Sequence, residues 1–108
     1  MRGNEDEDEQ EDEKENRIMT TQQREQARLS LLRYCESADQ YGLAGTLLLQ
    51  FVRNEGLRGV TREGLDAEIL YLADKGLLVS VNKLVSPENR AWRITAAGRD
   101  WLAERAGN

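Results

Sequence analysis

The sequence predicts an α+β fold that is mainly helical, with a three-helix core, a two-stranded β-hairpin and a C-terminal helix. Three observations predict this order. Apolar residues recur every three to four positions up to Lys75, which is the period of a helix with one buried face. From Leu77 the apolar residues alternate, which is the period of a strand. A turn at 86–89 and a capping threonine at Thr95 then separate the hairpin from the last helix.

The first two helices are predicted over residues 21–38 and 43–55. Thr20 or Thr21 can cap the first, because a threonine hydroxyl accepts a hydrogen bond from an otherwise unpaired backbone N–H. The second helix carries so many leucines that only a narrow polar edge remains, and such a helix is usually central in a small domain. Gly56 fits its C-terminal position.

The third helix is predicted from a cap at Thr61 to the region of Lys75, after a connector at 57–60 with one or two extended residues. Lys75 suits the last turn of a helix and Gly76 suits its end. The residues expected to form its buried stripe are Leu65, Ile69, Leu72 and Ala73.

The hairpin is predicted from strands at 77–85 and 91–94. Pro87 stands at the second position of the turn between them, where its fixed φ is favourable. In the second strand Trp92 and Ile94 share one face and Arg93 takes the other. Thr95 caps the last helix, whose expected inward residues are Ala97, Trp101 and Leu102.

Two segments carry a resemblance to a known family. The run YLADKGLL at 71–78 resembles the end of the recognition helix and the start of the wing in MarR-like winged helix-turn-helix proteins. The run ITAAGR at 94–99 resembles the end of the wing and the entry to the last helix of the same proteins. The resemblance covers about residues 27–105, and the whole run is similar to small winged-helix proteins of Mu-like prophages. Because winged helices also serve as protein-interaction modules, the motifs indicate the fold more than the function.

In DNA-binding winged-helix proteins the third helix enters the major groove and the wing contacts backbone or minor groove. The resemblance therefore implies that duplex DNA is read by the helix at 61–75 and the wing at 77–94, as in a small transcription regulator. The DNA-contacting residues that it implies are Arg58, Thr61, Arg62, Glu63, Asp66, Lys83, Arg90 and Arg93.

The charge of the third helix argues against this function. Residues 61–75 hold four acids and two bases, and a net negative helix repels phosphates. The alternative is a protein-interaction module of the same fold, acting in phage assembly or DNA packaging without binding DNA. Arg62, Glu63 and Arg93 are then solvated surface charges. Trp92 and Trp101 are expected in the core or an interface.

The acidic character of the chain lies at its N-terminus. Residues 1–17 hold nine acids and three bases, whereas the remainder holds 11 acids and 12 bases. We expect residues 1–19 to be a disordered acidic tail and residues 20–106 to be the winged-helix domain. One hypothesis is that residues 1–18 reflect an upstream start codon before Met19. Another is that the tail folds back on a basic face and competes with nucleic acid.

Composition disfavours most other functions. The 108 residues include no histidine and one cysteine, which removes the usual general base and any cysteine-rich zinc site. We expect no enzyme activity, no metal and no cofactor. Cys35 is expected to be a small buried hydrophobe. A free thiol and the lack of a long apolar stretch predict a cytoplasmic protein without a membrane segment. The expected partners are duplex DNA, a second copy joined through the first or last helix, or another protein.

Overall fold

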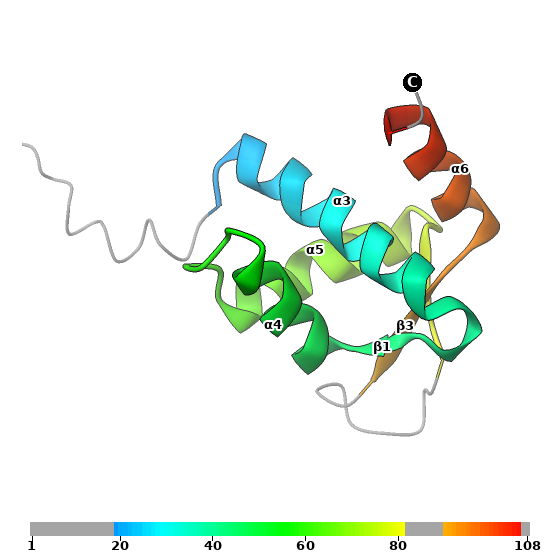
Figure 1. Cartoon of the computed structure of the whole chain (residues 1–108), viewed down its shortest axis with the longest axis horizontal. Helices are drawn as coiled ribbons and strands as arrows, with labels where there is room; N and C mark the ends of the chain where they lie inside the picture. The colour runs from blue at the N-terminus through cyan, green and yellow to red at the C-terminus, as the bar shows by residue number, and fades with distance from the viewer. Residues whose placement is uncertain (1–18, 82–89, 107–108) are drawn as a thin grey trace, which may run out of the picture.

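Four α-helices and a three-stranded antiparallel sheet make up residues 19–81 and 90–106, the part of the chain that the computed structural model describes (Figure 1). The predicted α+β class with mainly helical content is confirmed. None of the helices in these two ranges is long and apolar enough to cross a bilayer. The elements in chain order are α3 (Thr21–Ala38), the 3₁₀ turn η1 (Asp39–Tyr41), β1 (Leu43–Ala44), α4 (Gly45–Asn54), α5 (Arg62–Asp74), β2 (Leu78–Ser80), β3 (Ala91–Ile94) and α6 (Ala96–Ala106).

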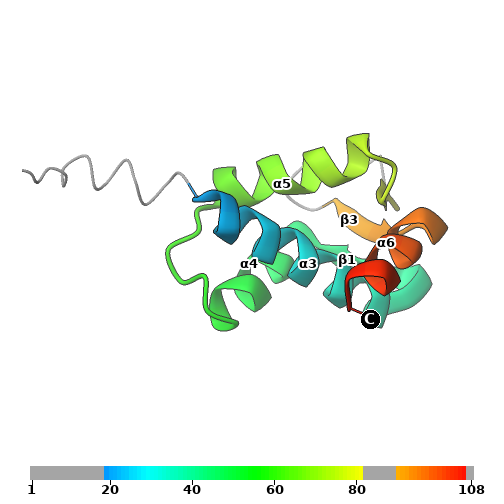
Figure 2. The same cartoon turned by 90° about the horizontal axis from the view of Figure 1, so that it is seen from above.

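The first helix, α3, lies at the centre of the fold and contacts α4, α5, α6 and the sheet (Figures 1 and 2). It begins as predicted, because the Thr20 hydroxyl accepts a 3.1 Å hydrogen bond from the backbone N–H of Gln23, and the Gln23 side chain accepts one of 2.9 Å from Thr20 N–H. This reciprocal arrangement is a capping box. Leu31, Leu32 and Cys35 are fully buried on its inner face, and the predicted burial of Cys35 is confirmed.

The second helix differs from its prediction in both position and bounds. Residues 43–44, which were expected in the helix, form β1 instead, because they pair with β3: Leu43 lies opposite Trp92 and Ala44 opposite Ala91. The helix α4 then begins at Gly45. It is not the central helix, since Leu47 is 42% exposed and α3 takes that place.

The third helix, α5, has the predicted cap and end, and its predicted buried stripe is confirmed except at Ala73, which is only partly buried. The Thr61 hydroxyl accepts a 3.0 Å hydrogen bond from Gly64 N–H. At the other end Gly76 has a φ of 81°, and the N–H groups of Gly76 and Leu77 donate back to Ala73 and Leu72 at 2.9 Å. These two bonds form a Schellman motif, which needs a left-handed residue where glycine stands. The buried residues of the helix are Leu65, Glu68, Ile69 and Leu72.

The sheet has three strands in the order β1-β3-β2 rather than the two that were predicted. The two hairpin strands are antiparallel, with Leu78 opposite Ile94 and Ser80 opposite Trp92. Trp92 and Ile94 are buried on one face of β3, as predicted. The described part of the first hairpin strand is β2; the predicted turn at 86–89 lies outside the described residues.

The last helix, α6, is fixed to the hairpin through Thr95. The Thr95 hydroxyl donates a 2.6 Å hydrogen bond to the backbone oxygen of Gly76 and accepts one of 3.0 Å from Gly98 N–H. A Cβ atom at Gly98 would overlap the backbone oxygen of Leu77 and the Ile94 side chain. Only glycine therefore allows α6 to approach the hairpin this closely. Leu102 is buried and Trp101 packs partly against the core.

Candidate nucleic-acid interface

Two of the predicted DNA-contacting residues meet at the start of α4. The backbone N–H of Gly45 donates a 3.3 Å hydrogen bond to the backbone oxygen of Arg90. A Cβ atom built on Gly45 would lie 3.7 Å from an Nη atom of Arg62. The fold therefore brings the first residue of α5 and the residue before β3 to the same point, at the N-terminus of a third element.

The N-terminus of α4 adds positive potential at this point. Its cap residue, Ala44, supplies no side-chain acceptor for the first-turn N–H groups, and Gly45, the first residue of the helix, is buried, whereas Thr46 is exposed. The N-terminal end of a helix carries the positive end of its dipole, and N–H groups there commonly bind phosphate oxygens. The Arg62 guanidinium lies beside this end of the helix.

Arg62 and Asp66, both predicted to contact DNA, bind each other. The Arg62 Nε atom lies 3.2 Å from both carboxylate oxygens of Asp66, one helical turn along α5. The two side chains are 33% and 45% exposed. A pair this exposed stabilises a helix by only about 0.3–0.5 kcal/mol. The pair cancels the charge of Asp66 and holds the guanidinium at the start of the helix.

A second acid of α5 is turned away from the outer surface. The Glu68 side chain is 8% exposed and accepts a 2.6 Å hydrogen bond from Arg28 Nε on α3. Arg24 Nε lies 3.9 Å from its other oxygen. This contact was not predicted from the sequence. The available signal was that Glu68 occurs three residues after Leu65, at the spacing of the buried stripe.

The outward face of α5 therefore carries fewer unpaired carboxylates than the four acids of the helix suggest. On the side away from the buried stripe lie Glu63, Ala67, Leu70 and Asp74, all exposed. Leu70 is 53% exposed. Two carboxylates flank an apolar patch on this face, and the remaining two acids of the helix are paired with arginines.

The other predicted residues are spread over the molecule. Thr61 uses its hydroxyl as the α5 cap. Arg58 is exposed in the connector after α4, at the opposite end of that helix from Gly45. Arg93 is half-buried and paired with Val79 of β2. Lys83 lies outside the described residues.

The Arg90 side chain is partly buried next to Trp92. The Arg90 guanidinium stands 5.9 Å from the centre of the Trp92 ring, and its Nε atom is buried without a hydrogen-bond partner among the described residues.

Burial raises the pKa of the Cys35 thiol to about 12. A thiol of this kind stays protonated near neutral pH and is a poor nucleophile.

The structure gives no indication of a metal site in residues 19–81 and 90–106, where no three candidate ligands gather. The geometry that bears on function is thus the junction of α4, Arg62 and Arg90, and the outward face of α5. No protein-family model and no curated protein matches this chain.

Proposed function

We propose that this chain is a winged helix-turn-helix protein that binds duplex DNA, with α5 in the major groove and the segment at 77–94 as the wing. The predicted order of three helices, hairpin and helix is present and supports this proposal. The observation that carries it is the junction at Gly45, where the α4 N-terminus, Arg62 and the Arg90 backbone converge.

The junction supplies the phosphate contacts of the proposed complex. The N–H groups of Thr46 and Leu47 in the first turn of α4 bind one phosphate, and the Arg62 guanidinium lies beside it. The exposed Arg62–Asp66 pair contributes little to stability, and in the proposed complex a phosphate competes with the Asp66 carboxylate for the guanidinium. Arg90 and Arg93 from the hairpin and Lys83 from the predicted wing add further positive charge.

The outward face of α5 supplies the base contacts. Glu63 stands in the first turn, and a glutamate there can accept a hydrogen bond from a cytosine amino group. Ala67 and Leu70 offer apolar contact to thymine methyl groups. No lysine or arginine lies on this face, so bidentate guanine contacts are not part of the proposal.

The proposal is tested by opposite charge changes at the Arg62–Asp66 pair in the full chain. Arg62→Ala removes a cation and Asp66→Asn removes an anion, and neither side chain is buried. DNA affinity at low salt should fall in the first variant and rise in the second. The slope of log K against log salt should shrink by about 1 in Arg62→Ala.

The matched control is Arg33→Ala, an exposed arginine of α3 that is not part of the junction. It should leave both affinity and salt slope close to those of the unchanged protein. Equal losses in Arg33→Ala and Arg62→Ala, or no change in either, would contradict the proposed interface.

A second candidate function is a protein-interaction module that uses the same face of α5. The specific observation in its favour is Leu70, which is 53% exposed with Glu63 and Asp74 on the same face. An apolar centre with acidic neighbours suits a partner with a basic rim. If the full chain shows no salt-dependent DNA binding, this candidate replaces the first.

We also propose a cytoplasmic location and a homodimer formed through α3 or α6. Sedimentation of the full chain over a range of concentrations tests the dimer. A mass that stays at one chain throughout would rule it out.

A further inference from the structure

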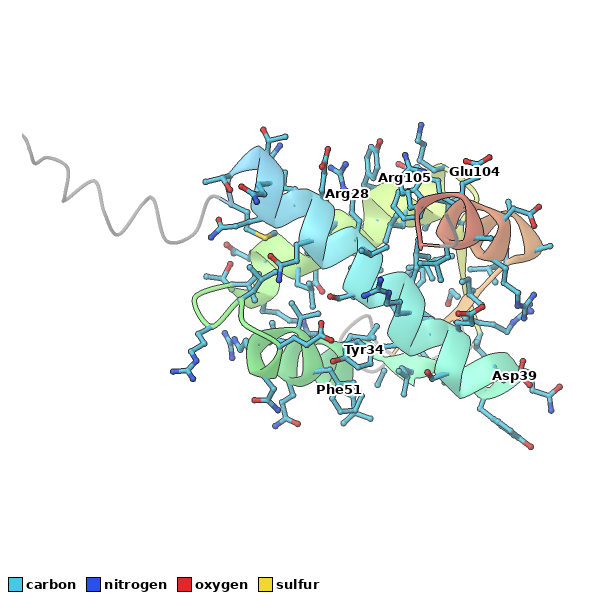
Figure 3. The ribbon with its side chains drawn as sticks, turned by 45° about the horizontal axis from the view of Figure 1, so that its top comes forward. Arg28, Tyr34, Asp39, Phe51, Glu104 and Arg105 are labelled. Carbon is cyan, nitrogen blue, oxygen red and sulfur yellow. The ribbon has the colours of Figure 1, made fainter. Side chains whose placement is uncertain are left out.

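A groove separate from the proposed DNA interface runs between α3, α5 and α6. Its volume is about 790 Å³. Leu29 from α3, Leu72 from α5 and Trp101 from α6 line its apolar part. Arg28 and Arg105 lie on the same side of the molecule, on α3 and α6 (Figure 3). We call this feature the α3–α5–α6 groove.

The charge of the groove is positive. Three cations line it, Arg28, Lys75 and Arg105, against one carboxylate, that of Glu25. Because the buried Glu68 carboxylate neutralises Arg28, Lys75 and Arg105 against Glu25 leave a net charge of +1 (two minus one) at the groove. The rest of the lining is neutral: it consists of two glutamines, three leucines and two aromatic residues.

Two of the cations are held against aromatic rings. The Arg28 guanidinium lies 4.0 Å from the centre of the Tyr71 ring, and that of Arg105 lies 3.8 Å from the centre of the Trp101 ring. Lys75 approaches Tyr71 from 5.8 Å. Cation–π contact restricts where a long side chain points. The positive charges are therefore placed at the groove before any ligand arrives.

We propose that this groove binds the acidic N-terminal segment of the same chain, residues 1–17. That segment carries a net charge of −6, whereas the groove carries +1 once the Arg28–Glu68 pair is counted. Opposite charges tethered to each other meet at a high effective concentration. The carboxylates of the segment contact Lys75 and Arg105, because Arg28 already bonds Glu68.

The connection between segment and groove makes this contact possible. The segment joins the described chain at Met19, and Gln22 already lines the groove. Gln22 and Leu29, which both line the groove, lie about 10 Å apart along α3, because a helix rises 1.5 Å per residue. Seventeen residues can extend to about 55 Å, so the segment reaches both Lys75 and Arg105.

The test places a spin label on the segment in the full chain. Gln10→Cys provides the attachment point, and Cys35 does not compete for the label because it is fully buried. We expect loss of amide signal at Leu29, Lys75 and Trp101 in about 0.01 M salt, where the Debye length is about 30 Å. The signals should return in about 1 M salt, where that length is about 3 Å.

A double variant that reverses two charges of the groove lining tests whether the groove is the binding site. Lys75→Glu with Arg105→Glu should abolish the signal loss at Leu29 and Trp101, whereas Arg33→Glu, an exposed control on α3, should not. Both altered side chains in the pair are exposed, so the fold should persist, and the amide spectrum checks it. Signal loss at Arg62 and Arg90 instead would overturn the proposal in favour of the DNA interface. An absence of loss anywhere beyond α3's first turn would overturn it outright.

Discussion

Arg28 on α3 donates a 2.6 Å hydrogen bond to Glu68 on α5, across 40 residues of sequence. The Glu68 side chain is only 8% exposed. The bond removes one negative charge from the surface of the proposed recognition helix and ties that helix to the centre of the fold. Together with the Arg62–Asp66 pair, it explains why the charge of α5 counted from its sequence overstates the charge that it presents.

Loss of Arg28 should destabilise the protein. Arg28→Ala leaves the Glu68 carboxylate buried with only Arg24, 3.9 Å away, as a partner. Removing one partner of a buried pair costs about 3–5 kcal/mol, and we expect about 2–3 kcal/mol because Arg28 is 21% exposed. Urea unfolding measures the change. The double variant Arg28→Met, Glu68→Leu should recover most of the loss, and a double variant as unstable as Arg28→Ala would contradict this explanation.

The close approach of α6 to the hairpin predicts a strong effect at Gly98. Gly98→Ala places a methyl group on the backbone oxygen of Leu77, which cannot move without breaking its 3.0 Å bond to Thr95 N–H. Overpacking of this kind costs about 1–3 kcal/mol. Gly59→Ala is the control, because nothing lies within 4 Å of the added atom. Similar thermal midpoints for the two variants would show that the approach is not tight.

The cap at Thr95 predicts a loss of about 1–2 kcal/mol in Thr95→Ala. The hydroxyl that disappears serves both Gly98 N–H and the Gly76 oxygen. Guanidinium unfolding followed by circular dichroism measures the loss. Thr21→Ala is the comparison, since Thr21 is exposed and the cap of its helix is Thr20. A smaller change at Thr95 than at Thr21 would contradict the role of Thr95.

The fold should become less stable at alkaline pH because of Cys35. Burial raises the pKa of this thiol from 9.0 to about 12. Between these values the unfolded chain loses the thiol proton and the folded chain keeps it. The free energy of unfolding should then fall by up to about 1.4 kcal/mol per pH unit above pH 9.

Cys35→Ala isolates this contribution. The variant is less stable at every pH because of the cavity that it leaves, but its stability should decline less steeply above pH 9. Equal slopes for the two proteins between pH 9 and pH 11 would show that the thiol is not the group responsible.

Local signals in the sequence were sufficient for α3, α5 and α6, whereas the bounds of α4 depended on distant residues. Thr20, Thr61 and Thr95 each cap a helix through a hydroxyl three residues before the donor, and Gly76 ends α5. Capping depends on neighbouring residues alone, so a sequence pattern can reveal it. The buried faces of α3, α5 and β3 follow from apolar spacing for the same reason.

Contacts between residues far apart in the sequence could not be predicted from these local signals. Leu43 and Ala44 belong to an apolar run that has the character of a helix, and only pairing with Trp92 and Ala91 makes them a strand. The Arg28–Glu68 bond and the meeting of Arg62 with Gly45 likewise depend on how helices cross. The sequence therefore predicted some residues of the candidate interface, including Arg62 and Arg90, but not how the fold arranges them in space. Its binding function stays a prediction.

The measurement that tests the central proposal most directly is an NMR titration of the full chain with a random-sequence duplex at low and moderate salt. DNA binding at the junction predicts salt-sensitive shifts of the amides of Thr46, Arg62, Glu63 and Arg90, with Arg33 unchanged. Shifts absent at low salt, or confined to the α3–α5–α6 groove, would contradict the proposal and direct the search to a protein partner on α5.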